Sequence, residues 1–338
     1  SERAGPKEAI DLCRLMERLQ DPSFREPLVR WLESEDRDLC RAAMLALGSY
    51  GHMDYADRLV NGLSEAWSRR AAQRALARYG DTVVGHFLNL VRGKDVPVEL
   101  KREIPKVLAR IDTPASRSVL VASLYTHDSM VAFRALKALN RIRASDNLSY
   151  NQESFQPLLQ IWAKEYYGLL NMDLLLHSRQ SPEFRLMQKA VKERLDWSIE
   201  KIFRGLELFL PLGDAYFSYL GFTSARQDLR ENAIELIDSR VQGELRQTLL
   251  PIFAELHPYD VVRKGREIFK LPSDPPSAMA EAFFHGDPWL KCCTIGAVLA
   301  DRVESLRPHV EQACGDINPM VKETAGWALQ RWAAAKTS

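Results

Sequence analysis

Apolar and small residues recur along the chain in a nine-residue pattern that returns at a nearly constant interval. In this pattern positions 1, 5, 8 and 9 are almost always apolar or small, and the positions between them are mostly polar. This spacing puts the apolar positions on one face of a helix, so each copy predicts an amphipathic helix. Seven segments carry the pattern: LCRAAMLAL, SRRAAQRAL, LKREIPKVL, VAFRALKAL, LRENAIELI, LKCCTIGAV and VKETAGWAL, ending at Leu47, Leu76, Leu108, Leu139, Ile237, Val298 and Leu329.

A turn and a second apolar stretch follow several of these helices. Examples are YADRLVNGL, TVVGHFLNL and RSVLVASLY, which begin at Tyr55, Thr82 and Arg117. We predict that Gly48, Gly51 and Gly80 end helices, because a residue of positive φ is common there. Asp287-Pro288 and Asn318-Pro319 have the sequence of helix starts, since proline is tolerated in the first turn. Each repeat is therefore predicted to be a helical hairpin.

The ends of the first four copies are 29, 32 and 31 residues apart, and the next two gaps, 98 and 61 residues, are close to three and two such periods. A hairpin of about 30 residues cannot bury its apolar face alone, so consecutive hairpins must stack. We predict an all-α protein, an α-solenoid of about ten helical hairpins.

The middle of the chain departs from the short-helix pattern. Helical periodicity runs unbroken over residues 151–177 and 182–210, which predicts two lengthened helices. The proline-rich stretch LPSDPPS, residues 271–277, predicts a break. The expected organisation is a single solenoid over residues 1–338, with regular repeats at 1–144, divergent repeats at 145–270 and regular repeats again at 278–332.

The composition is that of a folded protein, with 46% hydrophobic and 27% charged residues. Lys plus Arg (46) and Asp plus Glu (45) nearly cancel, so the overall charge carries no signature of nucleic-acid or membrane binding. Five cysteines make no disulfide framework, and no apolar run is long enough for a membrane helix. The chain does not start with methionine. We expect a cytoplasmic segment of a longer protein.

No motif for catalysis or cofactor binding is found in the sequence. Neither G-x-x-x-x-G-K-[ST] nor G-x-G-x-x-G nor H-E-x-x-H occurs, and the seven histidines are scattered. We therefore predict no catalytic residue, no metal site, no cofactor and no small-molecule substrate. Cys292 and Cys293 are adjacent and would point about 100° apart on a helix, so they are predicted to be small buried hydrophobes rather than metal ligands.

The balanced charge conceals a local excess of cations. Residues 66–143 contain 15 Lys plus Arg against 6 Asp plus Glu. Positions 3, 7 and 11 of the second, third and fourth copies lie on the helix face away from the small residues, and all but Phe133 are cationic. We call these residues the basic ladder: Arg70, Arg74, Arg78, Arg102, Lys106, Arg110, Lys137 and Arg141. They form either a solvated outer face or a binding face for an anionic surface. No aromatic residues are interleaved for base stacking, so we expect no nucleic-acid partner.

The helix pattern D-x-x-Φ-R/K-x-x-A-x-x-A-L, paired with a second helix at a period near 30, resembles the HEAT repeat, an armadillo-like helical unit. A narrower resemblance, over roughly residues 30–332, is to the soluble HEAT-repeat region of ATP/ADP-translocase-like membrane transporters of bacteria and some algae. It rests on FRALKALNRIR (133–143), RLDWSIEKIFRGLELFLP (194–211), LRENAIELIDS (229–239) and GDINPMVKETAGWAL (315–329). The resemblance implies a location at the cytoplasmic face of a membrane.

The expected function is that of a non-enzymatic scaffold for protein interaction or coupling. Its expected partner is another protein, a neighbouring domain of the parent protein, or an anionic membrane surface. One alternative is an enzyme built on HEAT-like repeats, of the bilin lyase or alkyl-base DNA glycosylase type, and another is a free-standing adaptor. Such enzymes place acidic or aromatic residues in the concave groove, whereas the second helices here would supply mostly Leu, Val, Ser and Asn.

Overall fold

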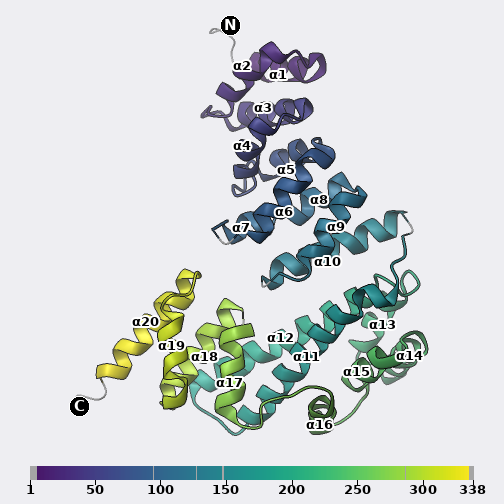
Figure 1. The fold of residues 1–338 in the computed structure, drawn as a ribbon, viewed down its shortest axis with the longest axis vertical. Coiled ribbons are helices and arrows are strands. Elements are labelled where there is room, and N and C mark those ends of the chain that lie inside the picture. Colours follow the sequence, from purple (N-terminus) through teal and green to yellow (C-terminus); the bar gives the residue numbers. More distant parts are fainter. Residues whose placement is uncertain (1–5, 94, 127, 147, 286, 335–338) are drawn as a thin grey trace. The chain divides into compact units, whose positions relative to one another are not determined.

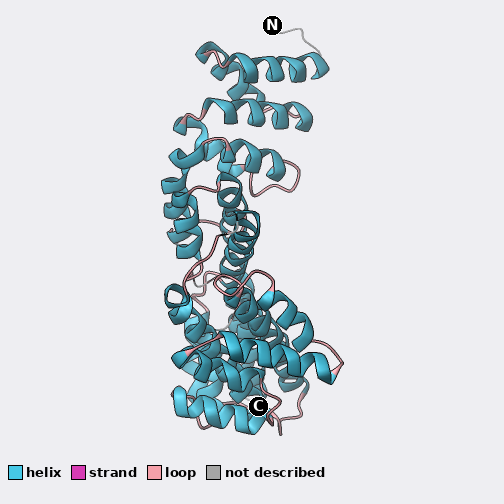
Figure 2. Cartoon of the chain, turned by 90° about the vertical axis from the view of Figure 1, so that its right-hand side faces the viewer, coloured by secondary structure: helices cyan, strands magenta, loops and turns pink. Residues whose placement is uncertain are grey.

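The computed structural model describes residues 6–93, 95–126, 128–146, 148–285 and 287–334. Every regular element in these ranges is a helix (Figure 1; Figure 2), which confirms the predicted all-α class. No helix in these ranges combines the length and the apolar character needed to cross a bilayer. The chain divides into two compact units, Ser1–Leu148 and Ser149–Ser338. A single solenoid over residues 1–338 stays a prediction.

The first unit consists of short helices in two rows. The first row contains α1 (Pro6–Leu19), α3 (Arg37–Tyr50), α5 (Arg69–Ala77), α8 (Ile104–Ile111) and α10 (Ser129–Asp146), and each of these helices contacts the next. The second row contains α2 (Arg25–Trp31), α4 (Ala56–Asn61), α6 (Val84–Arg92) and α9 (Pro114–Ser123). Three 3₁₀ turns, Pro22–Phe24, Met53–Tyr55 and Gly80–Val83, lead into α2, α4 and α6, and the single turn α7 (Val98–Lys101) precedes α8.

The first four copies of the sequence pattern form the first row, and their predicted inner positions are buried. Position 5 is Ala43, Ala72, Ile104 or Ala135, and position 9 is Leu47, Leu76, Leu108 or Leu139; all eight are 0% exposed. Alanine at position 5 in three of the four copies lets neighbouring helices approach closely, and leucine at position 9 fills the space between them. The helix register predicted from the sequence is therefore confirmed in this unit.

The predicted roles of the three glycines hold for two of them. Gly51 follows α3 and Gly80 follows α5, with φ of 60° and 57°. The prediction for Gly48 was wrong, because Gly48 lies inside α3 and is buried. A Cβ atom on Gly48 would lie 2.5 Å from the Cα atom of Ala75. Gly48 is therefore a contact point between α3 and α5 rather than a helix end.

The second unit is built around two long helices, α11 (Gln152–Leu176) and α12 (Pro182–Leu206), of 25 residues each, which confirms the predicted lengthened helices. They pack against each other, and α12 also contacts α18 (Pro288–Ala300), which in turn contacts α20 (Pro319–Ala334). The remaining helices are α13 (Asp214–Phe222), α14 (Gln227–Arg240), α15 (Gly243–Phe253), α16 (Pro258–Ile268), α17 (Pro275–His285) and α19 (Arg307–Ala313).

Three of the helix starts in this unit that contain proline bear on the sequence predictions. The Asp287 side chain accepts a hydrogen bond from the Trp289 N–H at 2.8 Å, and Asn318 accepts one from Met320 at 3.0 Å, as predicted for helix starts. The predicted break at residues 271–277 is shorter than expected. Pro275 already begins α17, because a proline at the first helical position loses no hydrogen bond.

Candidate functional site: the basic ladder of the first unit

The basic ladder residues come from the second, third and fourth copies of the repeat pattern. These copies form α5, α8 and α10 with the residues next to them. Because α5 contacts α8 and α8 contacts α10, the ladder residues lie on or beside adjacent helices. Seven of the eight residues are exposed, as predicted, and Arg102 is half-buried. Arg70 and Arg74 lie on α5 with Arg78 at its end, Arg102 follows α7, Lys106 and Arg110 lie on α8, and Lys137 and Arg141 lie on α10.

Three members of the ladder form ion pairs within the unit. Nη2 of Arg102 lies 3.0 Å from Oδ2 of Asp128, and Nζ of Lys106 lies 3.0 Å from Oε2 of Glu103. Arg78 reaches back over the preceding helices. Its Nη2 atom lies 2.7 Å from Oε1 of Glu17, and its Nη1 atom donates to the backbone carbonyl of Leu45 at 2.7 Å. Arg78 and Arg102 therefore link different repeats, whereas the pair of Lys106 with Glu103 lies within one repeat.

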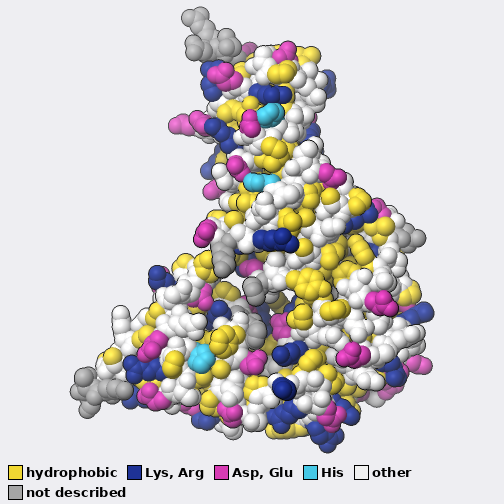
Figure 3. Space-filling view, in the orientation of Figure 1, with side chains coloured by type: hydrophobic (Ala, Val, Ile, Leu, Met, Phe, Trp, Pro, Cys, Tyr) yellow, Lys and Arg dark blue, Asp and Glu magenta, His cyan; other side chains and the backbone are white. Residues whose placement is uncertain are grey.

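The other five cations have no ion-pair partner among the described residues, and we call them the unpaired ladder residues: Arg70, Arg74, Arg110, Lys137 and Arg141. Nζ of Lys137 lies 5.6 Å from the centroid of the Phe133 ring. On the face of the molecule shown in Figure 3, Lys and Arg side chains are interspersed with Asp and Glu. The five unpaired ladder residues are exposed cations on the three adjacent helices α5, α8 and α10.

A buried carboxylate lies next to the ladder and joins the same three helices. The Glu103 side chain is only 5% exposed. It accepts hydrogen bonds from Nε2 of Gln73 at 2.9 Å, from Nζ of Lys106 at 3.0 Å and from Nη1 of Arg134 at 2.6 Å. Burial acts to raise the pKa of Glu103, but the hydrogen bonds and charges of Lys106 and Arg134 outweigh it and hold the pKa below its ordinary value. Glu103 is therefore ionised at neutral pH.

Sequence reasoning missed this buried network. Glu103 occupies position 4 of its copy, where the other first-unit copies have Ala42, Ala71 and Arg134. An acidic residue at a position that is otherwise small or basic was the one available signal. It could not identify the partners, because Gln73 and Arg134 belong to the preceding and following repeats.

Position 2 is Lys or Arg in five of the seven copies, and in three of these the side chain has a structural role that the sequence pattern did not reveal. Arg69 Nε donates to the Leu63 carbonyl at 2.9 Å, Lys101 Nζ donates to Gly93 at 2.5 Å, and Arg230 Nη1 donates to Ser224 at 2.9 Å. Each of these carbonyls lies just after the end of the preceding helix, where intrahelical donors run out. A cation there satisfies the carbonyl and interacts favourably with the helix dipole.

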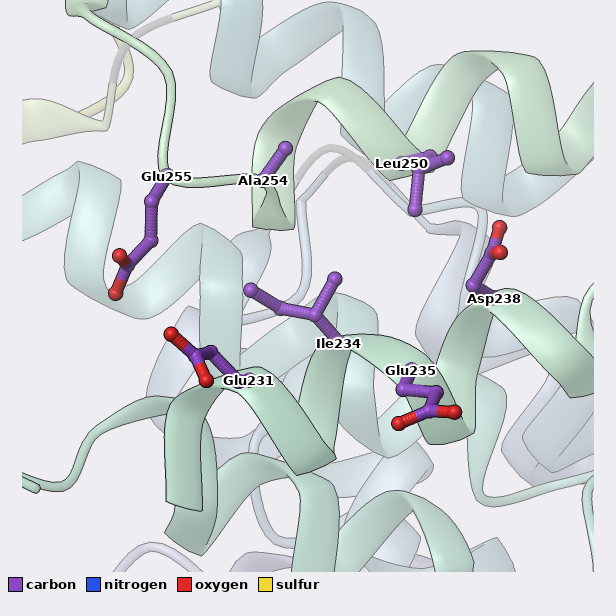
Figure 4. A pocket seen from close by; sticks show the side chains of 7 residues that line it. All are labelled: Glu231, Ile234, Glu235, Asp238, Leu250, Ala254 and Glu255. Atoms are coloured by element: carbon purple, nitrogen blue, oxygen red, sulfur yellow. The ribbon is translucent and has the colours of Figure 1, made fainter. Parts of the chain in front are cut away.

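The second unit contains an open hollow of about 480 Å³ between α14 and α15. Figure 4 shows four acidic side chains around it, with apolar side chains between them. Its lining consists of Glu231, Ile234, Glu235, Asp238, Leu250, Ala254 and Glu255. The repeat pattern predicts α14 as a repeat helix and contains no signal for this hollow.

In the described part of the chain, no group of three or more His, Cys, Asp or Glu side chains is arranged to hold a metal ion. Cys292 and Cys293 are 8% and 4% exposed, which confirms the prediction that they are small buried hydrophobes. Burial raises the pKa of Cys293 to about 12, so this thiol stays protonated at neutral pH.

Comparison with known proteins identifies no family for this chain. No known protein family matches the sequence, and no curated protein matches it. A crystal structure of an engineered protein from a structural genomics consortium is similar over 96% of this chain and 94% of that chain, with 16% sequence identity and a TM-score of 0.25. At this TM-score the similarity supports no conclusion about fold or function. The resemblance to HEAT-repeat regions of translocase-like transporters stays a prediction.

The sequence lacks both common phosphate-binding loops, so we expect that the isolated chain binds neither ATP, ADP nor cyclic nucleotides and does not hydrolyse ATP. Isothermal titration calorimetry with each nucleotide in the presence of magnesium checks this. Binding of any of them in the micromolar range would contradict it.

Proposed function

We propose that this chain is an α-solenoid of HEAT-type hairpins that acts as a non-enzymatic scaffold for protein interactions. The solenoid is supported by the repeat interval of 29 to 32 residues in the first four copies and by first-row helices that contact one another in order. In such repeats each hairpin contacts only its neighbours, and successive helices build an extended surface available for binding. About ten hairpins would form the complete solenoid.

The binding surface consists of the unpaired ladder residues. The observation that carries the proposal is that these five cations are exposed, lie on the adjacent helices α5, α8 and α10, and have no ion-pair partner among the described residues. Unpaired charges of one sign on neighbouring helices repel one another and do not stabilise the fold. A ligand of opposite charge would offset this repulsion.

The partner that fits this surface is an acidic protein face. Four of the five side chains are arginines, whose planar guanidinium binds carboxylates through two parallel hydrogen bonds. Among the described residues, α5, α8 and α10 carry no strongly exposed large apolar side chain, so the contact would be electrostatic. The family resemblance supports a more specific partner, namely a neighbouring domain of a translocase-like membrane protein at the cytoplasmic face of the membrane.

Charge reversal on the ladder tests the proposal. Arg74→Glu/Arg110→Glu/Arg141→Glu should keep its helical circular dichroism, because all three side chains are exposed. Its affinity for poly-L-glutamate, a mimic of an acidic protein face, should fall about tenfold or more, since each exposed charge pair contributes up to about 1 kcal/mol. Binding by the unmodified chain should weaken steeply with salt, because exposed charges are screened over about 8 Å at physiological ionic strength.

The matched control is Arg92→Glu, because Arg92 is an exposed cation on α6 in the second row. It should bind like the unmodified chain. If the control loses as much affinity as the triple variant, or if no binding is sensitive to salt, the ladder is only a solvated face. Vesicles with and without phosphatidylserine provide a second arm. If the chain binds the vesicles with phosphatidylserine but does not bind poly-L-glutamate, the partner is an anionic lipid surface and not an acidic protein face.

A further inference from the structure

The hollow between α14 and α15 has apolar and acidic lining residues. Ile234, Leu250 and Ala254 form its apolar floor, and Glu231, Glu235, Asp238 and Glu255 form its acidic rim. Four of its lining residues, Glu231, Ile234, Glu235 and Asp238, are spaced at i, i+3, i+4 and i+7, so they share one face of α14. Leu250 on α15 and Ala254 at its end complete the floor. Ile234 is half-buried and lies amid the carboxylates in Figure 4. Apolar surface is thus open to solvent inside a ring of acids.

The rim carries negative charge that the fold only partly neutralises. Asp238 accepts a hydrogen bond from Nε of Arg246 at 2.6 Å, and Glu255 accepts one from Nε of Arg230 at 2.7 Å. The hydrogen bond from Arg246 lowers the pKa of Asp238.

The two remaining rim carboxylates belong to Glu231 and Glu235. Glu231 accepts only from the neutral amide of Gln227, at 2.8 Å, and Glu235 has no partner among the described residues. Two carboxylates one turn apart on α14 therefore have no cationic partner among the residues that the structure describes. The lining, as far as the chain is described, contains no lysine or arginine.

The arrangement of these groups selects the type of ligand. The carboxylates do not converge on one point, and no set of three among the described residues could hold a metal ion. A fitting ligand must place an apolar group on Ile234, Leu250 and Ala254 and cationic groups around it. The hollow lies between two packed helices and has a volume of about 480 Å³, which exceeds one large side chain. Grooves of this kind accept an amphipathic helix through apolar anchors at turn spacing.

We infer that the hollow is a docking groove for a cationic amphipathic helix of a partner protein. An apolar side chain of that helix lies on Ile234, and lysines or arginines one turn away pair with Glu231 and Glu235. Charge complementarity identifies this occupant, because an acidic or neutral helix would leave both carboxylates uncompensated. The groove is in the second unit and is independent of the basic ladder, so either proposal can fail alone.

The test uses a fluorescein-labelled peptide of leucine and lysine patterned as an amphipathic helix, titrated with the full chain while its anisotropy is measured. Glu231→Gln/Glu235→Gln should weaken binding about fivefold or more, since an exposed ion pair is worth up to about fivefold in affinity. Ile234→Ala keeps helix propensity and should weaken binding by a similar factor, because it removes the apolar contact. A peptide with glutamate in place of lysine should not bind.

The matched control is Glu323→Gln, an exposed acid on α20 in the same unit, which should bind the peptide like the unmodified chain. Equal affinity of the unmodified chain and the double glutamine variant would overturn the inference, and so would an equal loss in the control. A second copy of this chain, presenting its basic ladder, is the competing occupant. Sedimentation without peptide tests it, and self-association that disappears in Glu231→Gln/Glu235→Gln would assign the groove to that copy instead.

Discussion

Replacing Glu103 by alanine is expected to lower the free energy of unfolding by about 3 kcal/mol, the lower end of the cost of breaking a buried ion pair. The Glu103 side chain is 5% exposed and accepts hydrogen bonds from Gln73, Lys106 and Arg134. Alanine would leave these donors without their acceptor, inside a contact that joins α5, α8 and α10. The cost should be at the lower end because Lys106 and Arg134 are 52% and 30% exposed and can turn toward water. Urea denaturation followed by circular dichroism measures the difference.

The conservative variant Glu103→Gln separates charge from shape, and its effect should depend on pH. The pKa of Glu103 in the folded chain is held below its ordinary value of 4.5. A lowered pKa contributes stability that is present above the ordinary value and is lost as the pH falls through the folded pKa. The unmodified chain should therefore exceed Glu103→Gln in stability at neutral pH, and this difference should shrink below about pH 4.5. A difference that stays constant into acid would show that the charge of Glu103 does not stabilise the network.

Replacing Gly48 by alanine is expected to destabilise the chain by about 2 kcal/mol, although alanine favours a helix by about 1 kcal/mol over glycine. The added Cβ would lie 2.5 Å from the Cα atom and 2.8 Å from the carbonyl oxygen of Ala75. These are backbone atoms of α5, so the clash can be relieved only by moving one helix away from the other. Such a shift would open the contact between α3 and α5 along its length.

The matched control for Gly48 is Gly85→Ala in α6. No atom lies within 4 Å of the position where its Cβ would be built, so this variant should be neutral or gain up to about 1 kcal/mol. Chemical denaturation of both variants gives the comparison. Equal stability of Gly48→Ala and Gly85→Ala would mean that α3 and α5 can separate without cost.

Several features of the fold could be predicted because they depend on residues close together in sequence. The 3.6-residue period of a helix determines which side chains share a face, so Ala72 and Leu76 could be assigned to the core from their spacing. The length of unbroken periodicity predicted α11 and α12, and the pair Asp287-Pro288 predicted the start of α18. The exposure of Arg74 and Arg110 follows from the same local geometry.

Three features could be known only from the tertiary structure: which ladder residues form ion pairs, which glycine is a contact point between helices, and where the hollow between α14 and α15 lies. By sequence spacing, Arg74 and Arg78 are equivalent members of the basic ladder, yet Arg78 is paired with Glu17 of α1 and Arg74 has no ion-pair partner among the described residues. Likewise Gly48 was indistinguishable from Gly51 until the approach of Ala75 was known. Ion pairing and close packing depend on distances between helices that are far apart along the chain, and local periodicity contains no information about those distances. The helix faces were therefore determined by the sequence pattern, whereas the partners of each face were determined by how the helices stack.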